Sequence, residues 1–263
     1  MIEKERIESG FRLRSLAHRI IVLEAIGSTN TYAKLLIDSP DSEGTIVVAD
    51  EQTSGKGRMT RTWHSPKGGL YFSIVLKANK DVSSYALYAL MAACCVHEAV
   101  KTESGLTPHL KWPNDILVNE RKLCGILSEL IIKQEEWDEE VYVILGIGIN
   151  VNNMTEGFPL DLQDVATSIK MECGCDSSLE DLLVEIVSRI DWWLEGDPIL
   201  SKVSQVYNNI CGTLGAKVIV DMGDRQVQGV AKEIKDDGLL VVEDDSGDVH
   251  SIRAGDVIYV RSE

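Results

Sequence analysis

The sequence is short of positive charge and lacks long apolar runs. It holds 26 Lys and Arg against 42 Asp and Glu, which gives a formal net charge of −16. Broad nonspecific binding to nucleic acid needs a cationic surface that releases phosphate counterions, so we expect no nucleic-acid partner. No run of about 18 apolar residues occurs, so we expect no membrane span. A small anionic ligand stays compatible with this charge, because a few local arginines can outweigh it.

Paired cysteine motifs are also missing. None of the six cysteines belongs to a Cys-x-x-Cys pair, and the N-terminus carries no secretory signal pattern. We therefore expect reduced thiols and a cytoplasmic protein. Cys173-Gly174-Cys175 is only a weak metal candidate, because no second cluster and no nearby histidine accompany it. We expect no protein-borne metal cluster.

Hydrophobic patterning predicts an α+β portion followed by a small all-β domain. The strands are expected at 19–26, 45–52, 70–76, 109–119, 122–132 and 141–151, with a hairpin turn at 119–121. Helices are expected after the capping residues 28–30, and at 83–103 and 178–195. From about residue 212, five short strands alternate with turns, which is typical of a five-stranded barrel. We place the domains at 1–208 and 209–263.

A glycine-rich basic loop, residues 52–63, is the most informative stretch. Its glycines allow a backbone to approach an anion closely. Lys56, Arg58 and Arg61 supply three positive charges within six residues, and Trp63 can stack on a planar base. The pattern suits a phosphate and a nucleotide, although a solvated basic turn would have the same local composition.

Two common phosphate-binding motifs do not fit. A Walker A loop needs Ser or Thr after Gly-Lys and a glycine five residues earlier, but Gly57 follows Lys56 and Asp50 takes the glycine position. The dinucleotide fingerprint fails as well, because Val151 replaces the third glycine after Gly146-Ile147-Gly148.

Three further strings carry candidate groups, each with a structural alternative. Residues 111–115 (KWPND) can hold an amide and a carboxylate toward a ligand, or form a structural corner. Lys122 begins an apolar strand, where it is either a solvated edge charge or a rigid cation aimed at developing negative charge. Glycines at 146 and 148 permit close approach of a ligand, or serve only packing.

Four segments in order, IGSTN (26–30), 49–76, 111–130 and LGIGINVN (145–152), together resemble the biotin–protein ligases. The resemblance covers about residues 19–260. It implies a mixed-sheet catalytic domain of the biotin/lipoate ligase type and a small C-terminal Src-homology-3-like β-barrel. It also implies ATP-dependent activation of biotin to biotinyl-5′-AMP and transfer to a lysine of a carrier domain.

The resemblance assigns roles residue by residue. Lys122 and Arg58 are the expected catalytic charges. The biotin-binding residues are expected to be Ser28, Thr29, Asn30, Gln52, Gly55, Lys56, Gly57, Arg58 and Lys122. The ATP-binding residues are expected to be Arg58, Arg61, Trp63, Asn114 and Asn150. Lys56 departs from the Arg or His of many members, and a lysine offers a point charge without a bidentate fork.

The family also implies substrates and partners. Biotin and ATP are the expected substrates with Mg²⁺, and the expected partner is the biotin carboxyl carrier domain of a biotin-dependent carboxylase. A homodimer is expected. Only about 18 residues precede the first strand, so we expect no DNA-binding repressor function. The alternatives are a lipoate–protein ligase and a non-catalytic biotin sensor. The loop at 52–63 favours biotin over lipoate, and Lys122 with Arg58 favours catalysis over sensing.

Overall fold

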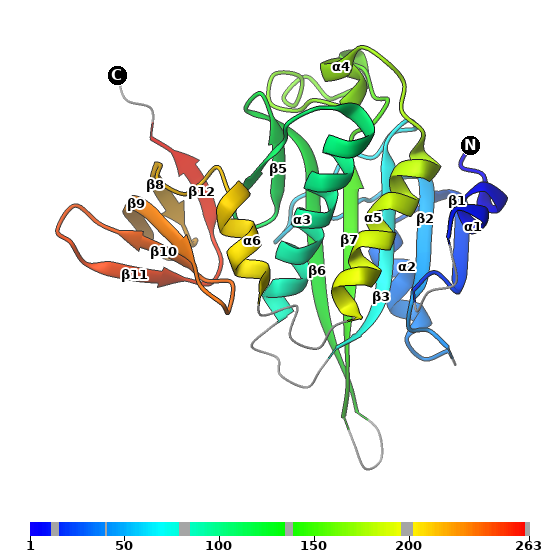
Figure 1. The fold of residues 1–263 in the computed structure, drawn as a ribbon, viewed down its shortest axis with the longest axis horizontal. Helices are drawn as coiled ribbons and strands as arrows, with labels where there is room; N and C mark the ends of the chain where they lie inside the picture. Colours follow the sequence, from blue (N-terminus) through cyan, green and yellow to red (C-terminus); the bar gives the residue numbers. More distant parts are fainter. Residues whose placement is uncertain (12–15, 40, 79–84, 135–138, 196–201, 261–263) are drawn as a thin grey trace.

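One mixed sheet of seven strands forms the centre of the larger domain (Figure 1). The computed structural model describes residues 1–11, 16–39, 41–78, 85–134, 139–195 and 202–260. The strands lie in the order β1-β2-β3-β7-β6-β5-β4, and only β1 and β2 pair in parallel. Their bounds are β1 Arg19–Ile26, β2 Thr45–Gln52, β3 Leu70–Ala78, β4 His109–Lys111, β5 Asp115–Val118, β6 Arg121–Gln134 and β7 Glu139–Ile149.

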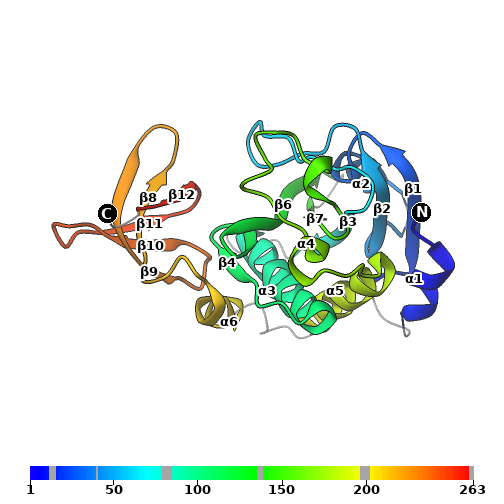
Figure 2. The same cartoon turned by 90° about the horizontal axis from the view of Figure 1, so that it is seen from above.

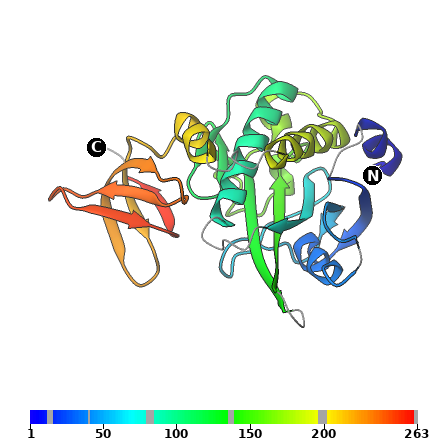
Figure 3. The same ribbon diagram turned by 60° about the horizontal axis from the view of Figure 1, so that its bottom comes forward.

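Helices cover both faces of this sheet, as Figures 2 and 3 show from two directions. Side chains alternate between faces along a strand. Ile46 and Val48 of β2 therefore join the large core under α3 and α5, whereas Val47 joins the smaller core under α2. The helices of the described chain are α1 Lys4–Gly10, α2 Thr29–Leu36, α3 Tyr85–Ser104, α4 Ile169–Cys173, α5 Leu179–Leu194 and α6 Val203–Ile210, with a 3₁₀ turn η2 at Thr155–Gly157.

The sequence predictions for the long helices are confirmed. Ser28 caps α2 and accepts the backbone N–H of Thr31, and Ser178 caps α5 in the same way from Asp181. The helix expected at 83–103 is α3, and positions 83 and 84 lie outside the described residues. None of the helices in the described ranges is long and apolar enough to cross a membrane.

One strand prediction is wrong. The expected strand 109–119 is divided into β4 and β5, which pair antiparallel around a turn that contains a cis Trp112–Pro113 peptide. Pro113 has no N–H for a strand ladder, so it suits the turn rather than the middle of a strand. The expected hairpin at 119–121 is confirmed between β5 and β6, with Asn119 and Glu120 both at positive φ.

The five predicted C-terminal strands are all present. They form an antiparallel sheet in the order β11-β10-β9-β8-β12, which lies beside the larger domain with α6 between them (Figure 1). Their bounds are β8 Lys217–Asp221, β9 Gln226–Ile234, β10 Leu240–Glu243, β11 Val249–Ile252 and β12 Asp256–Tyr259. We call residues 209–260 the C-terminal domain. The start of β12 reaches the pocket of the larger domain.

Candidate active site

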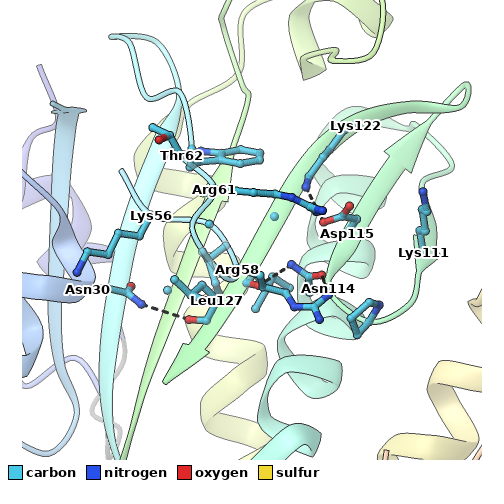
Figure 4. A pocket seen from close by; sticks show the side chains of 18 of the residues that line it. Asn30, Lys56, Arg58, Arg61, Thr62, Lys111, Asn114, Asp115, Lys122 and Leu127 are labelled. Carbon is cyan, nitrogen blue, oxygen red and sulfur yellow. Dashed lines mark hydrogen bonds and ion pairs between the residues drawn. The ribbon is translucent and has the colours of Figure 1, made fainter. Parts of the chain in front are cut away.

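A single pocket gathers segments that are far apart in the sequence (Figure 4). The sheet supplies its floor through the middle of β6 and the end of β7. The N-terminus of α2, the end of β2 and the loop after β2 form one side, and the β4–β5 turn and the start of β12 form the other. Because Ile26 pairs with Gln52, the end of β1 leads the capping residues of α2 directly alongside the end of β2.

A hydrogen-bond network orients the polar groups at the α2 end. Thr29 donates to Gln52 Oε1 from both its backbone N (2.9 Å) and its Oγ1 (3.1 Å), which fixes the orientation of this amide. Gln52 Nε2 donates one hydrogen to Ser65 Oγ at 2.9 Å. Buried Ser73 donates its hydrogen to either Thr29 Oγ1 or Asn30 Oδ1. These bonds fix the orientations of the polar side chains at this end of the pocket.

Asn30 is held by the sheet beneath it. Its Nδ2 donates to Leu127 O at 3.3 Å and to Glu129 Oε2 at 2.9 Å, and Lys34 Nζ lies 2.6 Å from Glu129 Oε1. Burial raises the pKa of Glu129, but the bonds from Lys34 and Asn30 outweigh it and leave that pKa below its ordinary value. Glu129 is therefore a charged anchor for Asn30.

Several polar groups at the α2 end of the pocket still have donors or acceptors free to bind a ligand. Ser28 Oγ accepts from Thr31, and within the described chain its own hydrogen is uncommitted, as is one N–H of Gln52. Thr29 Oγ1 and Asn30 Oδ1 each retain acceptor capacity. The pocket end thus offers donors and acceptors side by side, which suits a planar group with one carbonyl and two N–H groups.

The loop after β2 folds back over the pocket. Gly57 N donates to Arg61 O at 2.8 Å, and Trp63 N donates to Gly55 O at 2.9 Å. A Cβ on Gly55 would lie 2.4 Å from Trp63 O, so only glycine allows this close approach. Gly55 is not part of the pocket lining but fixes the base of the loop.

The indole of Trp63 lies over two glycines of the sheet. A Cβ on Gly148 would lie 2.4 Å from Trp63 Nε1, and one on Gly125 would lie 3.0 Å from Trp63 Cζ3. Trp63 Nε1 is buried and has no hydrogen-bond partner in the described chain. The indole can therefore pack directly against the backbone of the sheet only because positions 125 and 148 are both glycine.

Two lysines of the pocket, Lys122 and Lys111, contact other side chains of the same chain. Lys122 Nζ lies 2.6 Å from Asp115 Oδ1 and 5.4 Å from the centroid of the Trp63 ring. The contact with Asp115 is an ion pair without hydrogen-bond geometry. Lys111, on β4, stacks over the Tyr259 ring, and burial lowers its pKa. Figure 4 shows Lys122 and Asp115 pointing toward each other.

Two arginines of the loop reach the C-terminal domain. Arg61 hydrogen-bonds the carboxylate of Asp256 at the start of β12, and this bond raises the pKa of Arg61. Arg58 Nη1 donates to Asn114 Oδ1 at 3.1 Å and to Gly255 O at 3.2 Å. Burial lowers the pKa of Arg58, and the nearby carboxylate of Asp256 opposes this shift.

Most residues predicted from the sequence meet in this pocket. The lining includes Ser28, Thr29, Asn30, Gln52, Lys56, Gly57, Arg58, Arg61, Trp63, Asn114 and Lys122. Gly55 and Asn150 are not part of it. Asn150 is buried behind the floor, where its Nδ2 donates to Thr167 O at 3.0 Å and its backbone N to Leu123 O.

The pocket lining also includes residues outside the predicted binding set, among them Lys111, Asp115, Gly125, Gly148 and Asp256. Lys111 and Asp115 lie within the string KWPND, and Gly125 and Gly148 lie within strings already noted, so their neighbourhood was signalled. Asp256 had no local signal, because the chain that separates it from the loop is nearly 200 residues long. In the described ranges, no group of three or more His, Cys, Asp or Glu side chains could hold a metal.

Residues 22–150 match the Biotin/lipoate A/B protein ligase family, and residues 213–259 match the Biotin protein ligase C terminal domain. The bifunctional ligase/repressor of Bacillus spizizenii is 32% identical over 262 residues, which cover 97% of this chain and 78% of that protein. The chain belongs to the biotin protein ligase family.

A second relative and a solved structure of another protein, both similar to this chain, are also named as biotin ligases. The biotin--[acetyl-CoA-carboxylase] ligase of Mycobacterium tuberculosis is 29% identical, with 99% of this chain and 100% of that protein covered. The biotin protein ligase of Aquifex aeolicus, solved in complex with biotin and ATP, superposes with a TM-score of 0.77 at 28% identity. That match covers 94% of this chain and 100% of the Aquifex chain.

Proposed function

We propose that this biotin protein ligase joins biotin to ATP in the pocket described above, releases pyrophosphate and passes the biotinyl group from biotinyl-5′-AMP to a lysine of a biotin carboxyl carrier domain. The observation that carries the proposal is the pairing of two kinds of group in one pocket. Oriented donors and acceptors lie at the α2 end. On the other side of the pocket lie four cations, which are Arg58, Arg61, Lys111 and Lys122.

The α2 end suits the ureido ring of biotin. The ring has one carbonyl oxygen and two N–H groups. Ser28 and Gln52 can donate their free hydrogens to the carbonyl, and the oxygens of Thr29 and Asn30 can accept from the N–H groups. A dithiolane ring, as in lipoate, has no N–H or carbonyl to use these groups. A buried polar group that loses its partner costs about 1–3 kcal/mol, so this end selects against lipoate.

The opposite end suits anions that must be brought together. The carboxylate of biotin and the α-phosphate of ATP repel each other, so their approach needs fixed positive charge. We assign Lys122 and Arg58 to the carboxylate and the transferring phosphoryl group, and Arg61 to the phosphates. Lys56 and Gly57 belong to the loop segment over the biotin carboxylate, and Trp63 offers its ring face to the adenine.

The residues present also fit Mg²⁺. Asp115 Oδ1 is buried and paired with Lys122 Nζ at 2.6 Å, and it would serve as an oxygen ligand beside the phosphates once Lys122 turns toward the substrate. Magnesium is commonly held by one or two carboxylates together with substrate phosphates, where it offsets phosphate charge. The proposed role of Asn150 is indirect, because its amide holds the backbone behind Lys122 rather than reaching the pocket.

Amide formation follows at the same place. The carrier lysine attacks the acyl carbonyl of biotinyl-5′-AMP, the bond to the phosphate oxygen breaks, and AMP leaves with that electron pair. The folded loop, tied by Gly57 to Arg61 and by Trp63 to Gly55, keeps water from the mixed anhydride until the carrier arrives.

The organisation of the protein is proposed from the same features. Residues 1–208 hold the catalytic machinery, and 209–263 form the domain that presents Asp256 to it. We propose a carboxylase carrier domain as partner, a homodimer as assembly and the cytoplasm as location. The six cysteines are all free, which fits a reducing compartment.

Incubation of the protein with ATP, Mg²⁺ and either biotin or lipoate tests the proposal. We expect pyrophosphate release and an acyl-adenylate with biotin, and neither product above background with lipoate. Adenylation of lipoate at a comparable rate would refute the assignment of the α2 end. Binding of biotin without any adenylate would instead indicate a sensor.

A further inference from the structure

Cys173 and Cys175 form a close pair of thiols outside the pocket. Gly174 between them ends α4 in the left-handed conformation, with φ 79° and ψ 6°, and its N–H returns to Lys170 O at 2.8 Å. This reversal leaves the two Sγ atoms 3.3 Å apart. Cys175 is exposed and Cys173 is half-buried, whereas the other four cysteines are buried in the core.

We propose that Cys173 and Cys175 are a reversible dithiol–disulfide site that low-molecular-weight disulfides such as oxidised glutathione convert to an internal disulfide. A protein S–S bond is about 2.05 Å long, so the sulfurs must approach by about 1.2 Å. Rotation about the two Cα–Cβ bonds can supply such a movement at an exposed chain reversal. A ring closed over three residues is strained, and strained or exposed disulfides are the readily reduced ones.

The two thiols have distinct roles in the exchange. We assign the first attack to Cys173 and the second to Cys175, because the two sulfurs lie 3.3 Å apart and the hydrogen bond with Cys173 raises the pKa of Cys175. The Cys173 thiolate attacks one sulfur of the glutathione disulfide, forms a mixed disulfide and expels one glutathione thiolate. Cys175 then loses its proton, attacks the Cys173 sulfur and expels the second glutathione. The two protein thiols are oxidised by two electrons, and one glutathione disulfide is reduced to two thiols.

Glu172 directly precedes Cys173, and its side chain is hydrogen-bonded to the start of β6, which belongs to the pocket floor. The largely buried carboxylate of Glu172 accepts bonds from Arg121 at 2.7 Å, from Asn119 at 2.7 Å and from Thr167. Lys122 follows Arg121, and its backbone N and O bond Val165 O and Thr167 N. Closing the disulfide moves the end of α4, so we infer that the change reaches the backbone that carries Lys122.

The test is to treat the native enzyme with oxidised glutathione, block free thiols and map the peptides by mass. We expect Cys173 and Cys175 to lose two hydrogen atoms together, and dithiothreitol to restore both thiols. Cys175→Ser is the matched control, because it keeps Cys173 but lacks the resolving thiol. It should accumulate a stable glutathione adduct on Cys173, and Cys173→Ser should form no internal disulfide.

Two outcomes would overturn the proposal. One is a wild-type enzyme that holds a glutathione adduct as stably as Cys175→Ser, and the other is an enzyme in which neither thiol reacts while it is folded. Amide hydrogen exchange at 119–125 tests the connection to Lys122 without any assay of activity. We expect faster exchange in the oxidised enzyme, and an unchanged rate in the fully oxidised enzyme would refute the connection.

Discussion

Replacing Lys122 by methionine removes one positive charge from the pocket while keeping a side chain of similar length. Lys122 Nζ lies 2.6 Å from Asp115, so the change also leaves that carboxylate without its nearest cation. Two unit charges about 4 Å apart interact by roughly 4 kcal/mol at an effective dielectric constant of about 20. The loss of one such stabilising group in other active sites lowers kcat by about 10²–10³.

We therefore expect Lys122→Met to lower the single-turnover rate of adenylation by about 10²–10³, which is about 3–4 kcal/mol of barrier. The Kd for biotin should change by less than about tenfold, because the groups that face the ureido ring at the α2 end are untouched. The fold should survive, since Asp115 still has Arg58 and Lys111 in its electrostatic surroundings.

The assay is pyrophosphate release in a single turnover, with biotin binding measured separately by calorimetry. Lys232→Met is a matched control, because Lys232 pairs with Glu243 on the surface of the C-terminal domain. It should leave both quantities unchanged. An adenylation rate for Lys122→Met within tenfold of the wild-type rate would refute the catalytic role of Lys122.

Three further changes test other parts of the account. Gly148→Ala places a methyl group 2.4 Å from the present position of Trp63 Nε1, so it should displace the indole and raise the KM for ATP more than that for biotin. Asp256→Asn frees Arg61 from an exposed ion pair worth about 1 kcal/mol, so the KM for ATP should fall by no more than about fivefold; a higher KM would contradict this. Burial lowers the pKa of His97 below its ordinary 6.5, so the unfolded chain takes up the proton first, and stability should fall as the pH drops below 6.5. His97→Gln should lose that part of the acid sensitivity in urea unfolding measured above and below pH 6.5.

Local sequence was sufficient for much of the fold. The alternation of Ile46, Val47 and Val48 between two cores is a local property of an extended strand, and the caps at Ser28 and Ser178 are set by neighbouring residues. The sequence left a corner at residues 111–115 only as an alternative to a continuous strand, because an extended residue before proline is compatible with both a strand and a turn.

The pocket was predictable where its residues lie in short strings, and not where it depends on tertiary contacts. Asn150 stands in a glycine-rich string, yet its side chain points to Thr167 behind the floor, which spacing alone cannot tell. Asp256 meets Arg61 only because the C-terminal domain docks against the loop. Contacts between segments so far apart in the chain leave no periodic signal in a single sequence.

The most direct test of the central claim is the complete reaction. The enzyme is incubated with ATP, Mg²⁺, biotin and an isolated biotin carboxyl carrier domain, beside the same domain with its acceptor lysine changed to arginine. We predict stoichiometric biotinylation of the first domain, with one AMP and one pyrophosphate released for each biotin transferred, and no label on the second. Biotin binding without transfer, or equal labelling of both domains, would contradict the account.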